Sequence, residues 1–172
     1  MISQFSSLLL VVSIFLMGCS EPISLENTNP TSSSKISVTE NLGQKLPITA
    51  KAILPQGAII ELEVAKTRKQ QALGLMYRPE LPENRGMLFS FPSPQSAKFW
   101  MKNVPVPLDM VFMRNGVVKY IASSVSPCNQ DPCPTYGPRE LIDQVIELRS
   151  GRATQLGLKV GDRIKISTIS SQ

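Results

Sequence analysis

The chain has 172 residues, 42% of them hydrophobic, and its 18 basic and 13 acidic residues give a formal net charge of +5. Its bases are scattered, with Lys66, Arg68 and Lys69 as the one dense group, so no nucleic-acid partner is expected. The absence of histidine excludes Ser/His and Cys/His nucleophilic machinery and removes the commonest zinc ligand, so neither a metal nor a cofactor is predicted.

The amino-terminal segment indicates where the protein resides. An uncharged apolar run begins at Leu8 and ends at Gly18-Cys19, which is too short to cross a bilayer but long enough for a secretory signal core. The segment resembles a bacterial lipoprotein signal, which is cut before the cysteine that carries the lipid. We therefore expect a signal peptide at residues 1–18 and lipidation of Cys19; an ordinary cleaved signal and a buried amino-terminal strand are the alternatives.

Residues 19–45 differ in composition from the rest of the chain. They are rich in Ser, Thr, Asn and Pro, and their apolar residues are isolated, so burial cannot offset the entropy lost on folding. We predict a flexible tether here that holds the folded part away from the membrane. Residues 46–168 are then expected to form a single domain.

The domain begins with alternating apolar and polar residues, which are typical of strands. Residues 48–54 and 60–64 predict a hairpin that turns at Pro55-Gln56-Gly57. Glu61 and Glu63 are expected on its solvent face, as a solvated pair rather than a catalytic dyad.

A short helix is expected after this hairpin. Thr67 is a suitable amino-terminal cap for a helix from Arg68 to about Tyr77. Its inward side would be formed by Ala72, Leu75 and Met76.

Further apolar runs predict the remaining strands, which are expected at residues 87–91, 99–101, 108–113, 145–148 and 163–166. Asn115-Gly116 favours the positive φ angles of a two-residue hairpin turn. Ser150 is a plausible cap for a short helix that ends near Leu156, with Gly157 in a left-handed closing position. The predicted fold is mainly β: a small antiparallel barrel-like or sandwich-like domain with one or two short helices.

The acidic residues of the later strands and turns are interpreted as surface groups. Asp143 and Glu147 are expected on the exposed side of their strand, and Asp162 in a turn after Gly161.

Cys128 and Cys133 are the thiols that remain if Cys19 is lipidated, which is too few for an all-sulfur zinc site or an iron–sulfur cluster. They lie in a short proline-rich loop, and export would place that loop in an oxidising compartment. We expect a disulfide bond that fixes the shape of the loop. A redox-active pair is the rival interpretation, but the spacing lacks the Cys-x-x-Cys pattern.

Several separate motifs of the domain together resemble one bacterial and archaeal family. In chain order they are Gly74-Leu75-Met76 with Arg78, Gly86-Met87-Leu88-Phe89, Phe99-Trp100-Met101-Lys102-Asn103 with Pro107-Leu108-Asp109, and Gly151 with Gly157-Leu158-Lys159-Val160-Gly161-Asp162. From about Ile59 to Ile166 the chain resembles the domain of unknown function 192 family. The resemblance implies a small, mostly β, barrel-like domain that is often exported behind a signal or lipoprotein peptide, and it implies no established activity.

The segment from Phe99 to Asp109 is where a binding site is expected. As a strand, it directs Phe99 and Met101 toward the core and Trp100 and Lys102 to the other face. A flat aromatic ring beside a cation suits a sugar ring or another planar or anionic ligand.

Five residues are the ligand-binding candidates, namely Arg78, Trp100, Lys102, Asn103 and Asp109. Structural roles are the alternatives: a salt bridge between Arg78 and Asp109, a core position for Trp100, and a cap of the proline loop by Asn103.

Together these features predict a membrane-anchored cell-envelope lipoprotein on the periplasmic or outer-membrane face. Its domain is expected to be a non-enzymatic module that binds a small anionic or planar ligand or a partner protein. The alternative is an enzyme that acts on an envelope polymer, with Asp109 as general acid or base.

Overall fold

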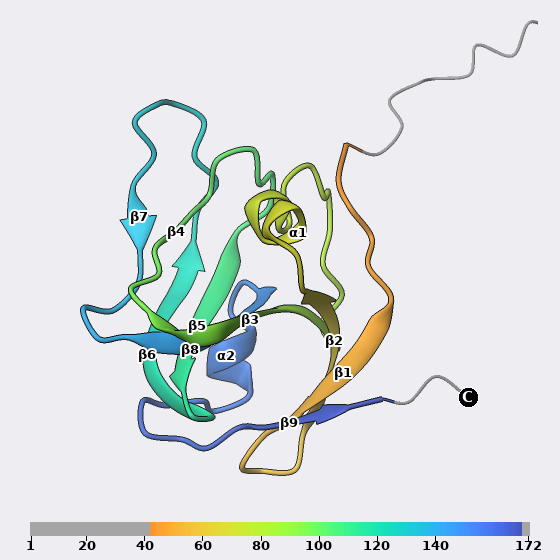
Figure 1. Cartoon of the computed structure of the whole chain (residues 1–172). Coiled ribbons are helices and arrows are strands. Elements are labelled where there is room, and N and C mark those ends of the chain that lie inside the picture. Colours follow the sequence, from red (N-terminus) through yellow and green to blue (C-terminus); the bar gives the residue numbers. More distant parts are fainter. Residues whose placement is uncertain (1–41, 170–172) are drawn as a thin grey trace, which may run out of the picture. The chain divides into compact units, whose positions relative to one another are not determined.

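The computed structural model of the chain describes residues 42–169, which form a mainly β domain with two short helices (Figure 1). The predicted signal peptide at residues 1–18, the lipidation site Cys19 and most of the tether at 19–45 lie outside these residues. The packed part of the domain includes Gln44, because its side-chain amide donates hydrogen bonds to the backbone oxygens of Gln70 (2.7 Å) and Gly74 (2.9 Å).

Seven strands form one sheet in the order β6-β5-β8-β3-β2-β1-β9, and β4 and β7 form a separate pair. The strands are β1 (Ile48–Ile53), β2 (Ile59–Ala65), β3 (Arg85–Gln95), β4 (Phe99–Trp100), β5 (Leu108–Arg114), β6 (Val117–Val125), β7 (Thr135–Tyr136), β8 (Ile142–Arg149) and β9 (Lys165–Thr168). The helices are α1 (Arg68–Leu73) and α2 (Arg152–Gln155). Strands β2 and β3 pair in parallel, and the other pairs are antiparallel.

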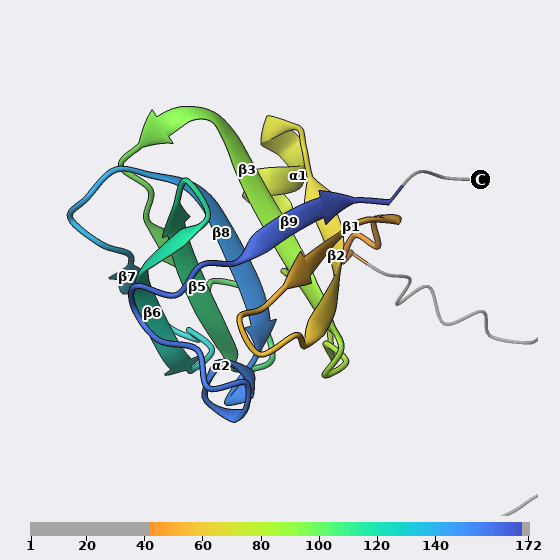
Figure 2. The same cartoon turned by 90° about the horizontal axis from the view of Figure 1, so that it is seen from below.

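The seven-stranded sheet is curved but does not close, so a barrel is the wrong description and the sandwich-like alternative fits. Arg163, just before β9, forms one isolated bridge with Val117 at the start of β6. The chain then leaves β6, and β9 pairs with β1 instead. Figure 2 shows this segment crossing from the β6 side of the domain to β1. Backbone hydrogen bonds also link residues 116–118 to residues 161–164, but β6 and β9 form no ladder that would join the two edges of the sheet.

The central strands are buried on both faces. Every residue of β5 from Leu108 to Met113 is buried, and neighbouring residues alternate between two hydrophobic clusters. One cluster includes Met110 and Phe112, and the other includes Val111 and Met113. Strands that are covered on both sides carry continuous apolar runs instead of alternation. This burial on both faces explains the apolar runs in the sequence at residues 87–91, 108–113 and 145–148.

The predicted hairpins are confirmed. Strands β1 and β2 pair around the turn at residues 55–57, and β5 pairs with β6 around Asn115-Gly116. Asn115 has a φ of 51° and Gly116 a φ of 71°, as a two-residue turn of this kind requires.

The first helix is capped as predicted but is shorter than expected. The Thr67 hydroxyl accepts from the Gln70 N–H, and the Gln70 side chain accepts from the Thr67 N–H. The helix ends at Leu73 rather than near Tyr77, because Gly74 has a φ of 47° and leaves the helical region. Ala72 is therefore exposed, and Leu75 is buried from the segment that follows the helix.

The carboxyl-terminal part differs in two details from the prediction. The second helix has Gly151, not Ser150, at its cap position, and no side chain of its own caps it. The last strand, β9, begins two residues later than the predicted 163–166 segment. Gly157 does adopt the left-handed conformation, with a φ of 64°.

Candidate functional site

The strand that carries the tryptophan has the predicted alternation. In β4, Phe99 packs edge-to-face against Phe89 (4.9 Å between ring centroids) and Phe112 (5.6 Å). Met101 is buried, whereas Trp100 is 46% exposed. The core position considered for Trp100 is therefore wrong, and its ring is available at the surface.

Lys102 lies beside this ring and next to an acidic residue. Its Nζ is 5.7 Å from the centroid of the Trp100 ring and 2.8 Å from Oδ2 of Asp131. Lys98, two residues before the ring, donates hydrogen bonds to the backbone oxygens of Gly137 and Pro138. Lys102 is thus the cation of this surface.

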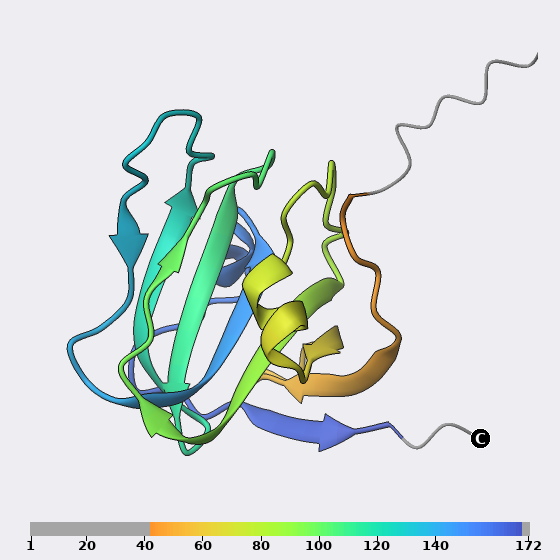
Figure 3. The same cartoon turned by 45° about the horizontal axis from the view of Figure 1, so that its top comes forward.

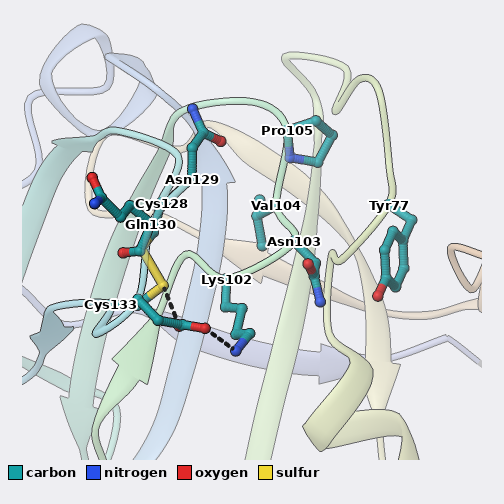
Figure 4. Close-up of a pocket in the computed structure, with 10 residues that line it drawn as sticks. Tyr77, Lys102, Asn103, Val104, Pro105, Cys128, Asn129, Gln130 and Cys133 are labelled. Carbon is teal, nitrogen blue, oxygen red and sulfur yellow. Dashed lines mark hydrogen bonds and ion pairs between the residues drawn. A yellow bond between two sulfur atoms is a disulfide. The ribbon is translucent and has the colours of Figure 1, made fainter.

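A cleft of about 440 Å³ opens between Lys102 and the disulfide loop (Figure 4). Its polar lining includes Tyr77, Lys102, Asn103, Asn129, Gln130 and Asp131. The predicted disulfide between Cys128 and Cys133 is confirmed, and both cysteines line the cleft.

Tyr77 and Asn103 form the side of the cleft opposite the disulfide. Both have left-handed backbone conformations, with φ values of 61° and 58°. The Tyr77 N–H donates to the Asn103 backbone oxygen at 2.7 Å. In Figure 4, Asn103 lies between Lys102 and Tyr77. The backbone thereby holds an amide and a phenol side by side at the edge of the cleft.

Arg78 is buried away from this cleft. Its Nη1 lies 2.8 Å from both carboxylate oxygens of Glu63, and Glu63 Oε2 also accepts from the Leu46 N–H. The expected salt bridge to Asp109 is therefore wrong, and so is the placement of Glu63 on a solvent face. Arg78 belongs to the segment after α1, and this segment lies against the end of β2 that carries Glu63.

Asp109 is fully buried and is used by the backbone. Its Oδ1 accepts from the N–H groups of Ser124 (2.7 Å) and Gly151 (3.0 Å), and its Oδ2 accepts from Ala153 (2.8 Å). Two of these donors belong to the amino-terminal end of α2. Asp109 thus supplies the cap that was expected from Ser150.

Of the five predicted site residues, Lys102 and Asn103 line the cleft. Trp100 lies beside Lys102, but its ring lines a separate groove. Arg78 and Asp109 are held elsewhere by buried contacts. Tyr77 and the loop residues Asn129, Gln130 and Asp131 line the cleft and were not among the candidates. The amides in the proline-rich loop between the two cysteines are the sequence signal that could have suggested them.

Glu147 was expected on a strand surface but is buried, with only 4% of its area exposed. Burial raises the pKa of Glu147 from 4.5 to about 8, and its Oε2 has no hydrogen-bond partner. It is aligned across the sheet with Met87 on β3 and Met110 on β5. A carboxyl group within the apolar run of residues 145–148 is the signal that could have identified it.

The other two carboxylates accept hydrogen bonds from the backbone: Asp143 accepts from the Asn115 N–H, and Asp162 accepts from the Lys159 N–H in the predicted turn.

Residues 42–169 hold no group of three or more His, Cys, Asp or Glu side chains that could bind one metal ion. In the same part of the chain, neither helix is long and apolar enough to cross a membrane.

Comparison with known proteins identifies the family. Residues 51–166 match the family DUF192, described as an uncharacterized ACR. One similar solved structure is a protein of unknown function from Novosphingobium aromaticivorans, with 32% identity, a TM-score of 0.61, and coverage of 68% of this chain and 83% of that one. Another is a proposed transcription regulator from Sinorhizobium meliloti, with 30% identity, a TM-score of 0.61, and coverage of 72% and 97%. Among curated proteins the search found no match. The chain belongs to the DUF192 family.

Proposed function

We propose that this DUF192 protein is a lipid-anchored cell-envelope protein whose domain binds a small anionic ring ligand, of the acidic-sugar type, beside its disulfide loop. The lipoprotein-like signal pattern at residues 1–19 supports the envelope location. The Cys128–Cys133 disulfide supports it as well, because such bonds persist in oxidising compartments.

The observation that carries the ligand class is the position of Lys102 at the cleft. Its ionic partner, Asp131, is exposed, and exposed ion pairs contribute roughly 0.2–1 kcal/mol. A ligand carboxylate or phosphate can therefore replace Asp131 at small cost. The ammonium group then binds the ligand with a charge-assisted hydrogen bond, which is stronger than a neutral one.

The rest of the lining suits a hydroxylated ring. Asn103, Asn129 and Gln130 each offer an amide that both donates and accepts hydrogen bonds, as hydroxyl groups require. Tyr77 is partly exposed and offers an aromatic face at the opposite wall. The disulfide and the Tyr77–Asn103 backbone contact fix these groups before binding, which lowers the entropic cost of binding.

The enzyme alternative rested on Asp109, and the geometry favours the binding module instead. The Asp109 carboxylate is buried under three backbone N–H donors and does not line the cleft. A general acid or base has to reach the proton that it transfers.

The ligand class is tested by titrating glucuronic acid into the purified domain, with glucose as the uncharged control. Glucuronic acid should bind more tightly than glucose, and added salt should weaken its binding. Substitution Lys102→Met should reduce the affinity for glucuronic acid about tenfold, because one charge-assisted contact is lost.

Lys119→Met provides the matched control. The Lys119–Glu140 pair has side-chain exposures of 35% and 66%, close to the 37% and 64% of the Lys102–Asp131 pair, but it does not line the cleft. This variant should bind like the unaltered domain. Equal affinities for glucuronic acid and glucose, or equal losses in the two variants, would contradict the proposal.

A further inference from the structure

A buried carboxyl group without a partner is costly to keep in a folded domain. Glu147 lies in a row across the sheet between Met87 and Met110, both fully buried, and these thioethers are weak hydrogen-bond acceptors. Its Oε2 makes no hydrogen bond. A group of this kind calls for an explanation beyond packing.

Glu147 contributes to the lining of a small cavity that is partly open to the surface. The cavity has a volume of about 30 Å³, enough for one water molecule or one vertex of a ring. Leu75, Met76, Phe99 and Trp100 are among the residues that surround it.

The cavity lies at the inner end of a larger surface groove. This groove, of about 400 Å³, shares Gln71, Ala72, Phe89, Phe99 and Trp100 with the small cavity. Its lining residues belong mainly to α1, β3 and β4. Figure 3 shows the yellow helix α1 in front of β3. The groove is distinct from the cleft beside the disulfide loop, because the two have no lining residue in common.

The charged groups that line the groove and the small cavity disfavour a cationic ligand. Glu147 is the only titratable residue of the inner cavity, and its cross-strand neighbours Met87 and Met110 are uncharged. Because burial raises the pKa of Glu147 to about 8, its carboxyl group is mainly neutral at pH 7 and can donate a proton to a hydrogen bond. Lys98 lines the outer groove and adds a positive charge.

We propose that the groove between α1, β3 and β4 is a second binding site, which takes a neutral planar heteroaromatic ligand whose acceptor atom receives a hydrogen bond from the Glu147 carboxyl group. The aromatic rings of Phe89, Phe99 and Trp100 form the walls for the ring of the ligand. The acceptor atom fills the inner cavity and satisfies Glu147. This site does not depend on the ligand proposed for the other cleft.

The test compares quinoline with indole by nuclear magnetic resonance. Both are flat two-ring molecules, but quinoline has an acceptor nitrogen where indole has an N–H donor. The chain contains one tryptophan, so a single indole N–H signal of the protein, that of Trp100, reports on the rim of the groove. Quinoline should shift this signal and saturate it, and indole should bind at least about fivefold more weakly.

Two variants identify the donor. Glu147→Met removes it with a side chain of similar volume, and this variant should bind quinoline and indole equally. Glu147→Gln keeps an N–H donor at every pH. Quinoline binding to the unaltered domain should fall as the pH rises through about 8, whereas Glu147→Gln should bind it equally at pH 6.5 and pH 9. Backbone amide spectra of each variant verify that it is folded.

Three results would overturn the proposal. One is the absence of any saturable shift of the Trp100 signal with quinoline, which would leave the cavity to an ordered water. The second is an undiminished preference for quinoline in folded Glu147→Met, because the donor would then be another group. The third is tighter binding of 2-phenylethylammonium than of quinoline, which would indicate a cation site.

Discussion

Two glutamates on the same face of the sheet have different surroundings. Glu63, Met87 and Glu147 are aligned across β2, β3 and β8. Glu63 is paired with Arg78, and its carboxylate also accepts from the Leu46 N–H. Glu147 is flanked by methionines and has one oxygen without a partner. The Glu63 carboxylate stabilises the contact between β2 and the segment after α1. The Glu147 carboxyl group has a raised pKa, so its protonation state changes with pH near neutrality.

This difference predicts how the stability of the domain changes with pH. The pKa of Glu147 is raised from 4.5 to about 8 by burial, so the folded state binds its proton more tightly than the unfolded state does. This contribution to stability is complete below pH 4.5 and is lost as the pH rises toward 8. The free energy of unfolding should fall by up to about 1.4 kcal/mol per pH unit in this window.

Urea unfolding of the domain at pH 5.5 and pH 7.5 measures this slope. Glu147→Gln is the control, because its amide stays neutral and should remove the contribution of this residue. If the two proteins lose stability in parallel between these pH values, Glu147 does not titrate in this window.

At the scale of residues, the sequence predicted directions of side chains better than their partners. The alternation of Phe99, Trp100 and Lys102 follows from strand geometry, and it is confirmed. The partner of Arg78 depends on which distant strand the segment after α1 covers. That contact joins residues far apart in sequence, so local pattern did not predict Glu63 in place of Asp109.

The second helix depends on a residue from another element. The helix α2 has four residues and a glycine at its cap position, so its own sequence does little to stabilise it. The Asp109 carboxylate accepts from Gly151 and Ala153 at its amino-terminal end and from Ser124 in β6. One side chain on β5 therefore connects α2 and β6.

Substitution Asp109→Ala should destabilise the domain by about 3 kcal/mol, because three buried backbone N–H groups lose a charged acceptor. The melting temperature should fall by roughly 10 °C. Asp143→Ala is the control, since Asp143 accepts from one exposed backbone N–H, and its loss should stay below about 1 kcal/mol. Equal effects of the two substitutions in a thermal melt would contradict the capping role.

At the scale of elements, the hairpin turns and the cap of the first helix were predictable, whereas the cap of the second helix and the burial of the strands were not. The turn at Asn115-Gly116 and the helix cap at Thr67 depend only on neighbouring residues, and both occur as predicted. We predicted Glu63 and Glu147 on solvent faces because we assumed that one face of the sheet is exposed to solvent. In this domain α1 and the segment after it cover the face that carries both residues, and periodicity alone does not reveal such a covering layer.

The whole chain joins the domain to an amino-terminal segment whose sequence resembles a lipoprotein signal. The fold class and family were predictable because several motifs agree from about Ile59 to Ile166, and the family match covers residues 51–166. The site was predictable in part: Lys102 and Asn103 line the cleft, and Trp100 lies beside Lys102. The cleft also needs the loop between Cys128 and Cys133, whose path the sequence does not specify.

The envelope location is the central claim, because it decides in which compartment the cleft and its disulfide loop would meet a ligand. The intact mass of the native protein, purified from the cells that make it, tests this location most directly. We predict a mature chain that starts at Cys19, carries the added mass of lipid, and lacks two hydrogens because Cys128 and Cys133 are joined. A soluble chain that retains Met1, without lipid and with both thiols reduced, would contradict the account.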